Sequence, residues 1–305
     1  MKSDRRSRRR LRALGSVLLA CTFSAAMAQP GKLLLTGGVS SVDGAAGGGI
    51  TPWAVIGGPA TDEQWAATAF ASAARTQDFR LAVQGVAVGW GDRLELSFAR
   101  QDLDTGNSLA PLGLAGLHLR QDILGLKLRL AGDAVLDADA LLPQIALGLL
   151  HKRSDAGALA PTLAGPLGAR GSGTEVYMSA SKLLLAPGVL LNATLRATRA
   201  NQGGLLGFGG SRAPGLRLQP EISVAKLLSR HLALGLEYRA KPDNLNQSVL
   251  GAGALKEDDW FDVFLAWAPN KQFSLTLAWV DLGAIAPGVQ PRRQAGAYLS
   301  GQLAF

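Results

Sequence analysis

The chain has one cysteine, Cys21, and only three histidines. Without a second cysteine the chain can form neither an internal disulfide nor a thiolate metal site. The histidines His118, His151 and His231 lie far apart and show no metal-ligand spacing. The sequence also lacks a Gly-x-Ser-x-Gly turn and the Gly-Lys-Ser/Thr ending of a phosphate loop. We therefore predict no metal, no cofactor and no enzyme.

Long hydrophobic runs are also missing after the first 28 residues. The longest uncharged run, 44–61, contains six glycines and two prolines, which a membrane-spanning helix would not tolerate. Yet 48% of the residues are hydrophobic and the mean hydropathy is +0.16, which is high for a soluble secreted protein. These features leave two classes, a transmembrane β-barrel or an unusually apolar soluble β-protein.

The first 28 residues have the composition of a signal peptide. Seven basic residues precede the apolar stretch 13–26, and Ala26-Met27-Ala28 fits signal peptidase, with Gln29 as the new N-terminus. Two alternatives are less favoured, a twin-arginine signal at Ser7–Leu11 and lipidation of Cys21, because a better cleavage site follows that cysteine. The chain is therefore expected to be exported.

Net charge depends mainly on this leader. The whole chain has 31 Lys and Arg against 23 Asp and Glu, a net charge of +8. The leader carries seven of the basic residues and one of the acidic residues, which leaves 24 against 22 in the mature chain. A mature chain so close to neutral does not favour nucleic acid as a partner.

Apolar and polar residues alternate with period two in many segments, which is typical of strands with one apolar face. In 92–100 Leu94, Leu96 and Phe98 alternate with polar residues, and 231–239 and 272–281 behave alike. The predicted strands are 65–75, 79–90, 92–100, 124–130, 141–152, 175–185, 189–199, 216–227, 231–239, 259–267, 272–281 and 297–305. Most have about the 9–11 residues that cross a membrane in a barrel.

The second face of these strands distinguishes a barrel from a soluble sandwich. It is rich in Ala, Gly, Ser and Thr, which suit a confined barrel interior, whereas the leucines suit lipid. We predict an interfacial aromatic girdle of Trp53, Trp90, Trp260, Trp267 and Trp279. The predicted fold is an all-β, transmembrane, antiparallel up-and-down barrel of about twelve strands, within a range of ten to fourteen.

The domain prediction is a signal peptide over 1–28 and a single barrel domain over 29–305. Residues 29–60 are too Gly-rich for a plain strand and too apolar for a flexible tail. We expect them to begin as a strand and then to fold against or into the lumen. The candidate lumen or pore residues, which alternate with the apolar face, are Arg93, Glu95, Lys127, Arg129, Glu237 and Arg239.

Four segments carry a resemblance to a known family. They are KLLLTGGVSSVDGAAGGGITPWAVIGG (32–58), RANQGGLLGFGG (199–210), EYRAKPDNL (237–245) and AWAPNKQFSLTLAWVDLG (266–283). In these segments the chain resembles the proteobacterial exported family of domain of unknown function 3034. The resemblance covers nearly the whole mature chain and implies a secreted β-rich protein, without site residues to carry over.

The expected function is that of an outer-membrane barrel, either a narrow pore or channel or a structural envelope protein. The expected partners are outer-membrane lipid, the barrel-assembly machinery and a small solute. One alternative is a soluble periplasmic β-protein that binds an apolar ligand with its leucines inward. Another is a barrel enzyme that acts on lipid, which would need a carboxylate–His or Ser–His pair.

The C-terminal strand suggests an assembly signal. Its last residue is Phe305, and Leu303, Gly301, Leu299 and Ala297 share that residue's face. Because this pattern resembles the terminal strand of bacterial outer-membrane barrels, we predict that deleting Phe305 lowers the fraction of protein inserted into the membrane. Membrane fractionation at native expression measures this, and unchanged assembly of the truncated chain would count against it.

Overall fold

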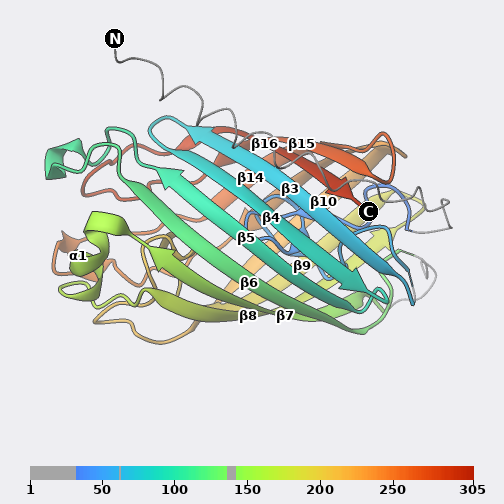
Figure 1. Cartoon of the computed structure of the whole chain (residues 1–305), viewed down its shortest axis with the longest axis horizontal. Helices are drawn as coiled ribbons and strands as arrows, with labels where there is room; N and C mark the ends of the chain where they lie inside the picture. Colours follow the sequence, from blue (N-terminus) through green and yellow to red (C-terminus); the bar gives the residue numbers. More distant parts are fainter. Residues whose placement is uncertain (1–31, 62, 136–141) are drawn as a thin grey trace, which may run out of the picture. The chain divides into compact units, whose positions relative to one another are not determined.

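The computed structural model describes residues 32–61, 63–135 and 142–305. Twelve antiparallel strands close into one barrel, and each pairs with its neighbours in chain order (Figure 1). The last strand closes the ring on the first, for example at Leu299 opposite Ala73. The predicted fold, a twelve-strand up-and-down barrel, is therefore confirmed.

The barrel strands and the smaller elements have the following bounds. The barrel consists of β3 (Trp65–Thr76), β4 (Arg80–Trp90), β5 (Leu94–Asp104), β6 (His118–Ala131), β7 (Gln144–Asp155), β8 (Ser172–Leu184), β9 (Val189–Thr198), β10 (Arg217–Ser229), β11 (Leu232–Arg239), β14 (Trp260–Trp267), β15 (Phe273–Asp281) and β16 (Ala295–Ala304). The remaining elements are β1 (Val39–Ser40), β2 (Ala46–Gly47), β12 (Gln247–Ser248), β13 (Gly251–Ala252), the 3₁₀ turns η1 (Ala110–Leu112), η2 (Gly157–Leu159) and η3 (Asn201–Gly204), and the helix α1 (Ala160–Ala164).

The largest differences from the predicted bounds are in β5 and β6, which both continue beyond the apolar alternation. The outward-facing extra residues are charged and pair across the two strands, as in Arg120 Nε donating to Asp102 Oδ2 at 3.0 Å. Opposite charges that face each other on neighbouring strands stabilise pairing as apolar residues do. The hydrophobic signal therefore ends before the strand does.

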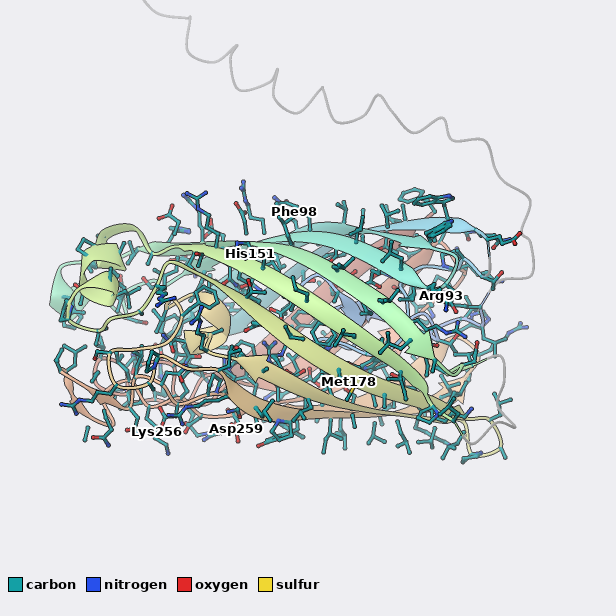
Figure 2. All side chains as sticks on the ribbon, turned by 90° about the horizontal axis from the view of Figure 1, so that it is seen from below. Arg93, Phe98, His151, Met178, Lys256 and Asp259 are labelled. Atoms are coloured by element: carbon teal, nitrogen blue, oxygen red, sulfur yellow. The ribbon has the colours of Figure 1, made fainter. Side chains whose placement is uncertain are left out.

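The two ends of the barrel differ. Most turns at one end are short, such as 91–93, 185–188 and 230–231, and we call it the short-turn end. Connections at the other end include 105–117, 156–171 with α1, 199–216 and 240–259, and we call it the long-loop end (Figure 1). Arg93 marks the first end, and Lys256 and Asp259 mark the second (Figure 2).

Apolar side chains cover the outer wall. Side chains project outward along the strands, Phe98 among them (Figure 2), and Leu124 is 58% exposed. Aromatic pairs stand near both ends, Trp65 with Trp90 at 5.9 Å and Phe261 with Trp279 at 6.4 Å between ring centroids. Such a surface is solvated by lipid and bounded by interfacial rings.

The aromatic girdle differs in part from the prediction. Trp90, Trp267 and Trp279 are exposed on the outer wall, as expected. The prediction is wrong for Trp53, which is buried and donates from Nε1 to Ser223 Oγ at 3.0 Å. It is also wrong for Trp260, whose ring lies under Lys241 inside the mouth of the barrel. Trp53 belongs to the N-terminal segment inside the barrel, and Trp260 shares the inward face of β14 with Asp262 and Phe264.

The inner wall carries the small and polar residues of the alternation. Ser179, Ser181 and Ser223 are fully buried there, with charged residues among them. Near the short-turn end, Leu183, Leu190 and Phe264 add an apolar cluster. Among the described residues, no helix is both long enough and apolar enough to cross a membrane. The predicted signal peptide, 1–28, lies outside the described residues.

The outward leucines generate a stability prediction. Leu126, in the apolar part of β6, is 42% exposed, and Leu130 lies on the same face close to the short-turn end. We expect Leu126→Arg to lower the free energy of unfolding by about 2–4 kcal/mol because it places a cation in the middle of the lipid. Leu130→Arg, near the interface, should lower it by only about 0–1 kcal/mol. Urea unfolding in phospholipid vesicles measures both, and equal effects would contradict a lipid-facing wall.

Candidate functional site

The N-terminal segment Lys32–Ala60 fills the barrel, and we call it the plug. Its small hairpin pairs Val39 with Gly47 and Ser40 with Ala46. Lys32 forms an ion pair with Asp92 in the β4–β5 turn, so the base of the plug lies at the short-turn end. The tip of the hairpin, around Asp43, reaches the parts of the wall nearest the long-loop end. The plug therefore enters and leaves through the same end.

Asp43 is the only charged residue of the sequence between Leu33 and Ala60, and it meets three cations. Its carboxylate lies 2.8 Å from Lys152 Nζ, 2.9 Å from Arg239 Nη1 and 3.4 Å from Arg196 Nη1. These cations also pair with two wall carboxylates, Glu175 at 2.8 Å from Arg196 and Glu221 at 2.5 Å from Arg196. We call these six residues the Asp43 network.

The Asp43 network balances its own charge, with three acids and three bases, all at most 3% exposed. Ion pairs taken out of water are stable only when every partner is present. The hairpin tip of the plug supplies the third acid. The wall alone would keep an excess positive charge at this level.

A second ion pair, closer to the short-turn end of the lumen, binds the backbone of the plug. Glu95 accepts hydrogen bonds from Ala46 N at 3.0 Å and Gly57 N at 2.7 Å. Lys127 Nζ donates to Ala46 O at 2.8 Å and Val55 O at 2.9 Å. The Lys127 and Glu95 side chains are 3.2 Å apart and 1% exposed. They therefore clamp both limbs of the plug.

The plug passes close to Glu237 at a glycine. A Cβ on Gly48 would lie 2.0 Å from Glu237 Oε1, so any other residue would displace this carboxylate. Glu237 Oε2 accepts hydrogen bonds from Gly49 N at 2.5 Å and Ile50 N at 2.8 Å. The Gly-rich sequence thus allows backbone N–H groups to reach a wall carboxylate.

A loop enters the lumen from the opposite end. The four residues of η3 are buried, and Gly203 O accepts a hydrogen bond from Lys152 Nζ at 3.0 Å. Beside it, Lys241 and Glu257 pair at 3.5 Å. Burial lowers the pKa of Lys241 to about 8 and raises the pKa of Glu257 to about 7, and the opposite charge of each partner opposes both shifts. These residues therefore narrow the lumen at the long-loop end.

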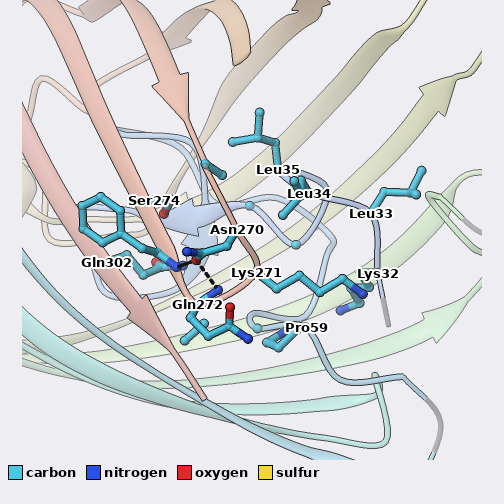
Figure 3. A pocket seen from close by; sticks show the side chains of 16 residues that line it. Lys32, Leu33, Leu34, Leu35, Pro59, Asn270, Lys271, Gln272, Ser274 and Gln302 are labelled. Carbon is cyan, nitrogen blue, oxygen red and sulfur yellow. Dashed lines mark hydrogen bonds between the residues drawn. The ribbon is translucent and has the colours of Figure 1, made fainter. Parts of the chain in front are cut away.

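Cavities beside the plug are small. One of about 50 Å³ lies at the base of the plug, where Lys32 to Leu35 face Asn270, Gln272 and Gln302 (Figure 3). This volume holds a few waters and no solute. A larger polar hollow of about 450 Å³ lies outside the lumen at the long-loop end, between Gln77, Asn107 and Gln290.

The six candidate lumen residues have different positions. Glu95, Lys127, Glu237 and Arg239 are buried on the inner wall and contact the plug. Arg129 lies near the short-turn end of β6. Its side chain is 20% exposed and forms ion pairs with Asp92 and Asp133. Arg93 is exposed in the β4–β5 turn, outside the lumen.

Four wall residues of the Asp43 network were not among the candidates, namely Lys152, Glu175, Arg196 and Glu221. Each shares a strand face with small polar residues, as Arg196 does with Asn192 and Thr194. The same period-two count would have placed them inward. Asp43 could have been found as the lone charge of an apolar, Gly-rich segment.

Two histidines on the outer wall each contact a polar side chain of a neighbouring strand, and the sequence alone did not predict these contacts. His118 Nδ1 lies 2.5 Å from Asp102 Oδ1, and His151 Nδ1 lies 3.0 Å from Thr174 Oγ1. In the described part of the chain, these two pairs do not share a member, so no complete hydroxyl–His–carboxylate triad results. No group of three or more acidic, His or Cys side chains among the described residues could hold a metal ion.

Residues 36–302 match the model of the family described as protein of unknown function (DUF3034). The chain belongs to this family. No curated protein matches the sequence. Of the four segments that carry the family resemblance, 32–58 makes up most of the plug, 199–210 contains η3, and 237–245 supplies Glu237, Arg239 and Lys241. The fourth, 266–283, packs against the plug through Ala266, Ala278 and Val280, so all four contribute to the filled lumen.

Solved structures with a similar fold are outer-membrane barrels. The NanC porin has a TM-score of 0.50 and 8% identity, covering 78% of this chain and 98% of that chain. An outer membrane channel from Pseudomonas putida F1 has 0.48 and 12%, covering 81% and 97%. Outer membrane phospholipase A from Escherichia coli has 0.41 and 8%, covering 77% and 89%. At such low identities the similarity shows the fold alone.

The Asp43 network generates a prediction about the plug. We expect Asp43→Asn to lower the free energy that holds the plug in the lumen by about 3–5 kcal/mol because the substitution leaves buried cations without a partner. Amide hydrogen exchange at Ala46 and Ile50, whose N–H groups bind the wall, measures this. Asp122→Asn, which breaks only the exposed pair with Arg100, is the control and should leave exchange unchanged. Unaltered protection in Asp43→Asn would show that the network does not hold the plug.

Proposed function

We propose that this protein is a channel of the bacterial outer membrane that its own N-terminal plug holds closed. The leader 1–28 would direct export, and the terminal strand with Phe305 would engage the barrel-assembly machinery. Because bacterial outer-membrane barrels have short periplasmic turns and longer external loops, the short-turn end would face the periplasm. The plug would then enter from the periplasmic side.

The observation that carries this proposal is that the polar inner wall of the barrel is covered by the plug, a segment that could leave the lumen. Eight strands make a barrel that its own side chains can fill, whereas sixteen or more leave an aqueous channel. A twelve-strand barrel lies between these sizes, and here the space is occupied by the plug and η3. Both limbs of the plug reach the same end, so it can be withdrawn without threading through the wall.

The inner wall that would be exposed after withdrawal of the plug is hydrophilic. Its exposed groups would be carboxylates, cations and hydroxyls such as Glu95, Lys127 and Ser223, which hydrate readily. Water could replace each backbone group that the plug now supplies. A lumen built only for rigidity could have been filled with apolar side chains instead.

The soluble alternative fits the fold poorly. A periplasmic protein that binds an apolar ligand needs its leucines inward, but Leu124, Leu277 and Leu299 are about half exposed on the outer wall. A structural barrel without transport remains the rival function, and it would stay closed with or without the plug.

Conductance in a planar bilayer tests the proposal. We expect the wild-type barrel to be closed and a variant without residues 32–58 to conduct ions. Removing the exposed hairpin 247–252 is the matched control, and that variant should stay closed. Heat-modifiable gel mobility verifies that each barrel has folded. A folded plug-deletion variant that does not conduct would refute the channel and leave the structural barrel.

A further inference from the structure

Two carboxyl groups meet on the lumen wall beside the plug. Glu237 of β11 and Asp262 of β14 are directly opposite in the strand register, and each is 1% exposed. Their oxygens close around Gly49 of the plug. A Cβ there would lie 3.3 Å from Asp262 Oδ2 and 3.5 Å from Glu237 Oε2. Like charges in this arrangement destabilise a sheet.

Glu237 has the environment of an ionised carboxylate. Gly49 N and Ile50 N donate to its Oε2. Thr51 Oγ1 and Ser223 Oγ, the latter at 2.8 Å, donate to its Oε1. A carboxylate has about four lone-pair sites, so the plug and wall already saturate it. Glu237 therefore holds the negative charge of the pair.

Asp262 has the opposite environment. Both of its oxygens are fully buried and accept no hydrogen bond from any side chain or from the plug among the described residues; the one donor near them is the backbone N–H of Glu237. The side chain lies within hydrogen-bonding reach of Glu237, but a carboxylate has no hydrogen to donate. A buried carboxylate with only one donor is strongly destabilised, whereas a protonated carboxyl group can donate to its neighbour.

No cation in the described lumen is left to neutralise this pair. Lys127 pairs with Glu95, Lys241 pairs with Glu257, and Lys152, Arg196 and Arg239 belong to the balanced Asp43 network. Across the pair, β15 presents the apolar Val280 opposite Asp262. From β16 Tyr298 faces the pair, and its hydroxyl donates to Ser72 at 3.1 Å.

We infer that Glu237 and Asp262 together bind one proton, carried by Asp262, and that this proton helps to hold the plug. A metal ion is a poorer fit, since hard cations need several free oxygen ligands and those of Glu237 are taken. When the pH rises far enough to remove the proton, two adjacent buried charges repel each other. The plug, which binds Glu237 through Gly49, Ile50 and Thr51, then loosens. This inference does not require that the barrel conducts.

Cysteine labelling of the plug tests the inference. Ser41→Cys introduces a thiol at a plug position that is 1% exposed. In detergent, the rate of its reaction with a maleimide is divided by the rate of the exposed Ser211→Cys at the same pH, which removes the effect of thiol deprotonation. This ratio should rise about tenfold between about pH 7 and about pH 10, which corresponds to ~1.4 kcal/mol. The neutral isostere Asp262→Asn in the same background should abolish this acceleration. Asp122→Asn, on the outer wall, is the matched control and should keep it.

Lysine deprotonation could also loosen the plug at alkaline pH, but Lys127 and Lys152 are the same in all variants. An equal acceleration in Asp262→Asn would therefore overturn the inference. Infrared spectroscopy of the wild-type protein, with ¹³C-labelled aspartate, gives a second readout that does not depend on a variant folding. A protonated aspartate band at neutral pH supports the inference, and its absence overturns it. Conductance of the plug-deletion variant does not affect either result.

Discussion

A polar lumen wall that is cut off from water must find its hydrogen-bond and charge partners inside the protein. This constraint explains the plug. Twelve strands enclose more space than their own side chains fill, and the inward face carries charged groups such as Glu95, Lys127 and Glu237. The plug satisfies them with backbone N–H and C=O groups and with one carboxylate, that of Asp43. The stability of the plug in the lumen depends on this exchange of water for protein.

The same chemistry is compatible with withdrawal of the plug, which the proposed channel requires. A buried ion pair gains little over its hydrated ions, so the Asp43 network is stable as a complete set and unstable when one member leaves. The glycines of the plug contribute by allowing close approach, as Gly48 does against Glu237. Small side chains also leave little to obstruct withdrawal. These many replaceable polar contacts support the proposal that the plug acts as a gate.

The outer wall follows a separate rule. Contact with lipid requires apolar side chains on the outward-facing alternate residues, and this requirement does not depend on what the inward-facing residues bind. The two faces of a strand are therefore nearly independent, as in β6, where Leu124, Leu126 and Leu128 face lipid while Lys127 binds the plug. Near the long-loop end the outer face becomes charged, and pairs such as Arg120 with Asp102 replace the leucines. This division lets one fold carry very different lumens.

The strands and their two faces could be predicted from the sequence because alternation along a strand is a local property of neighbouring residues. The sequence pattern placed all twelve strands, and its inward count included Glu95, Lys127, Glu237 and Arg239. The predicted strand 92–100 wrongly included Arg93, because alternation does not mark where strand pairing begins or stops. Which charges become neighbours could not be predicted in the same way. Asp43, Glu175 and Arg239 become neighbours only through register and closure of the barrel, which depend on contacts between residues far apart in the chain.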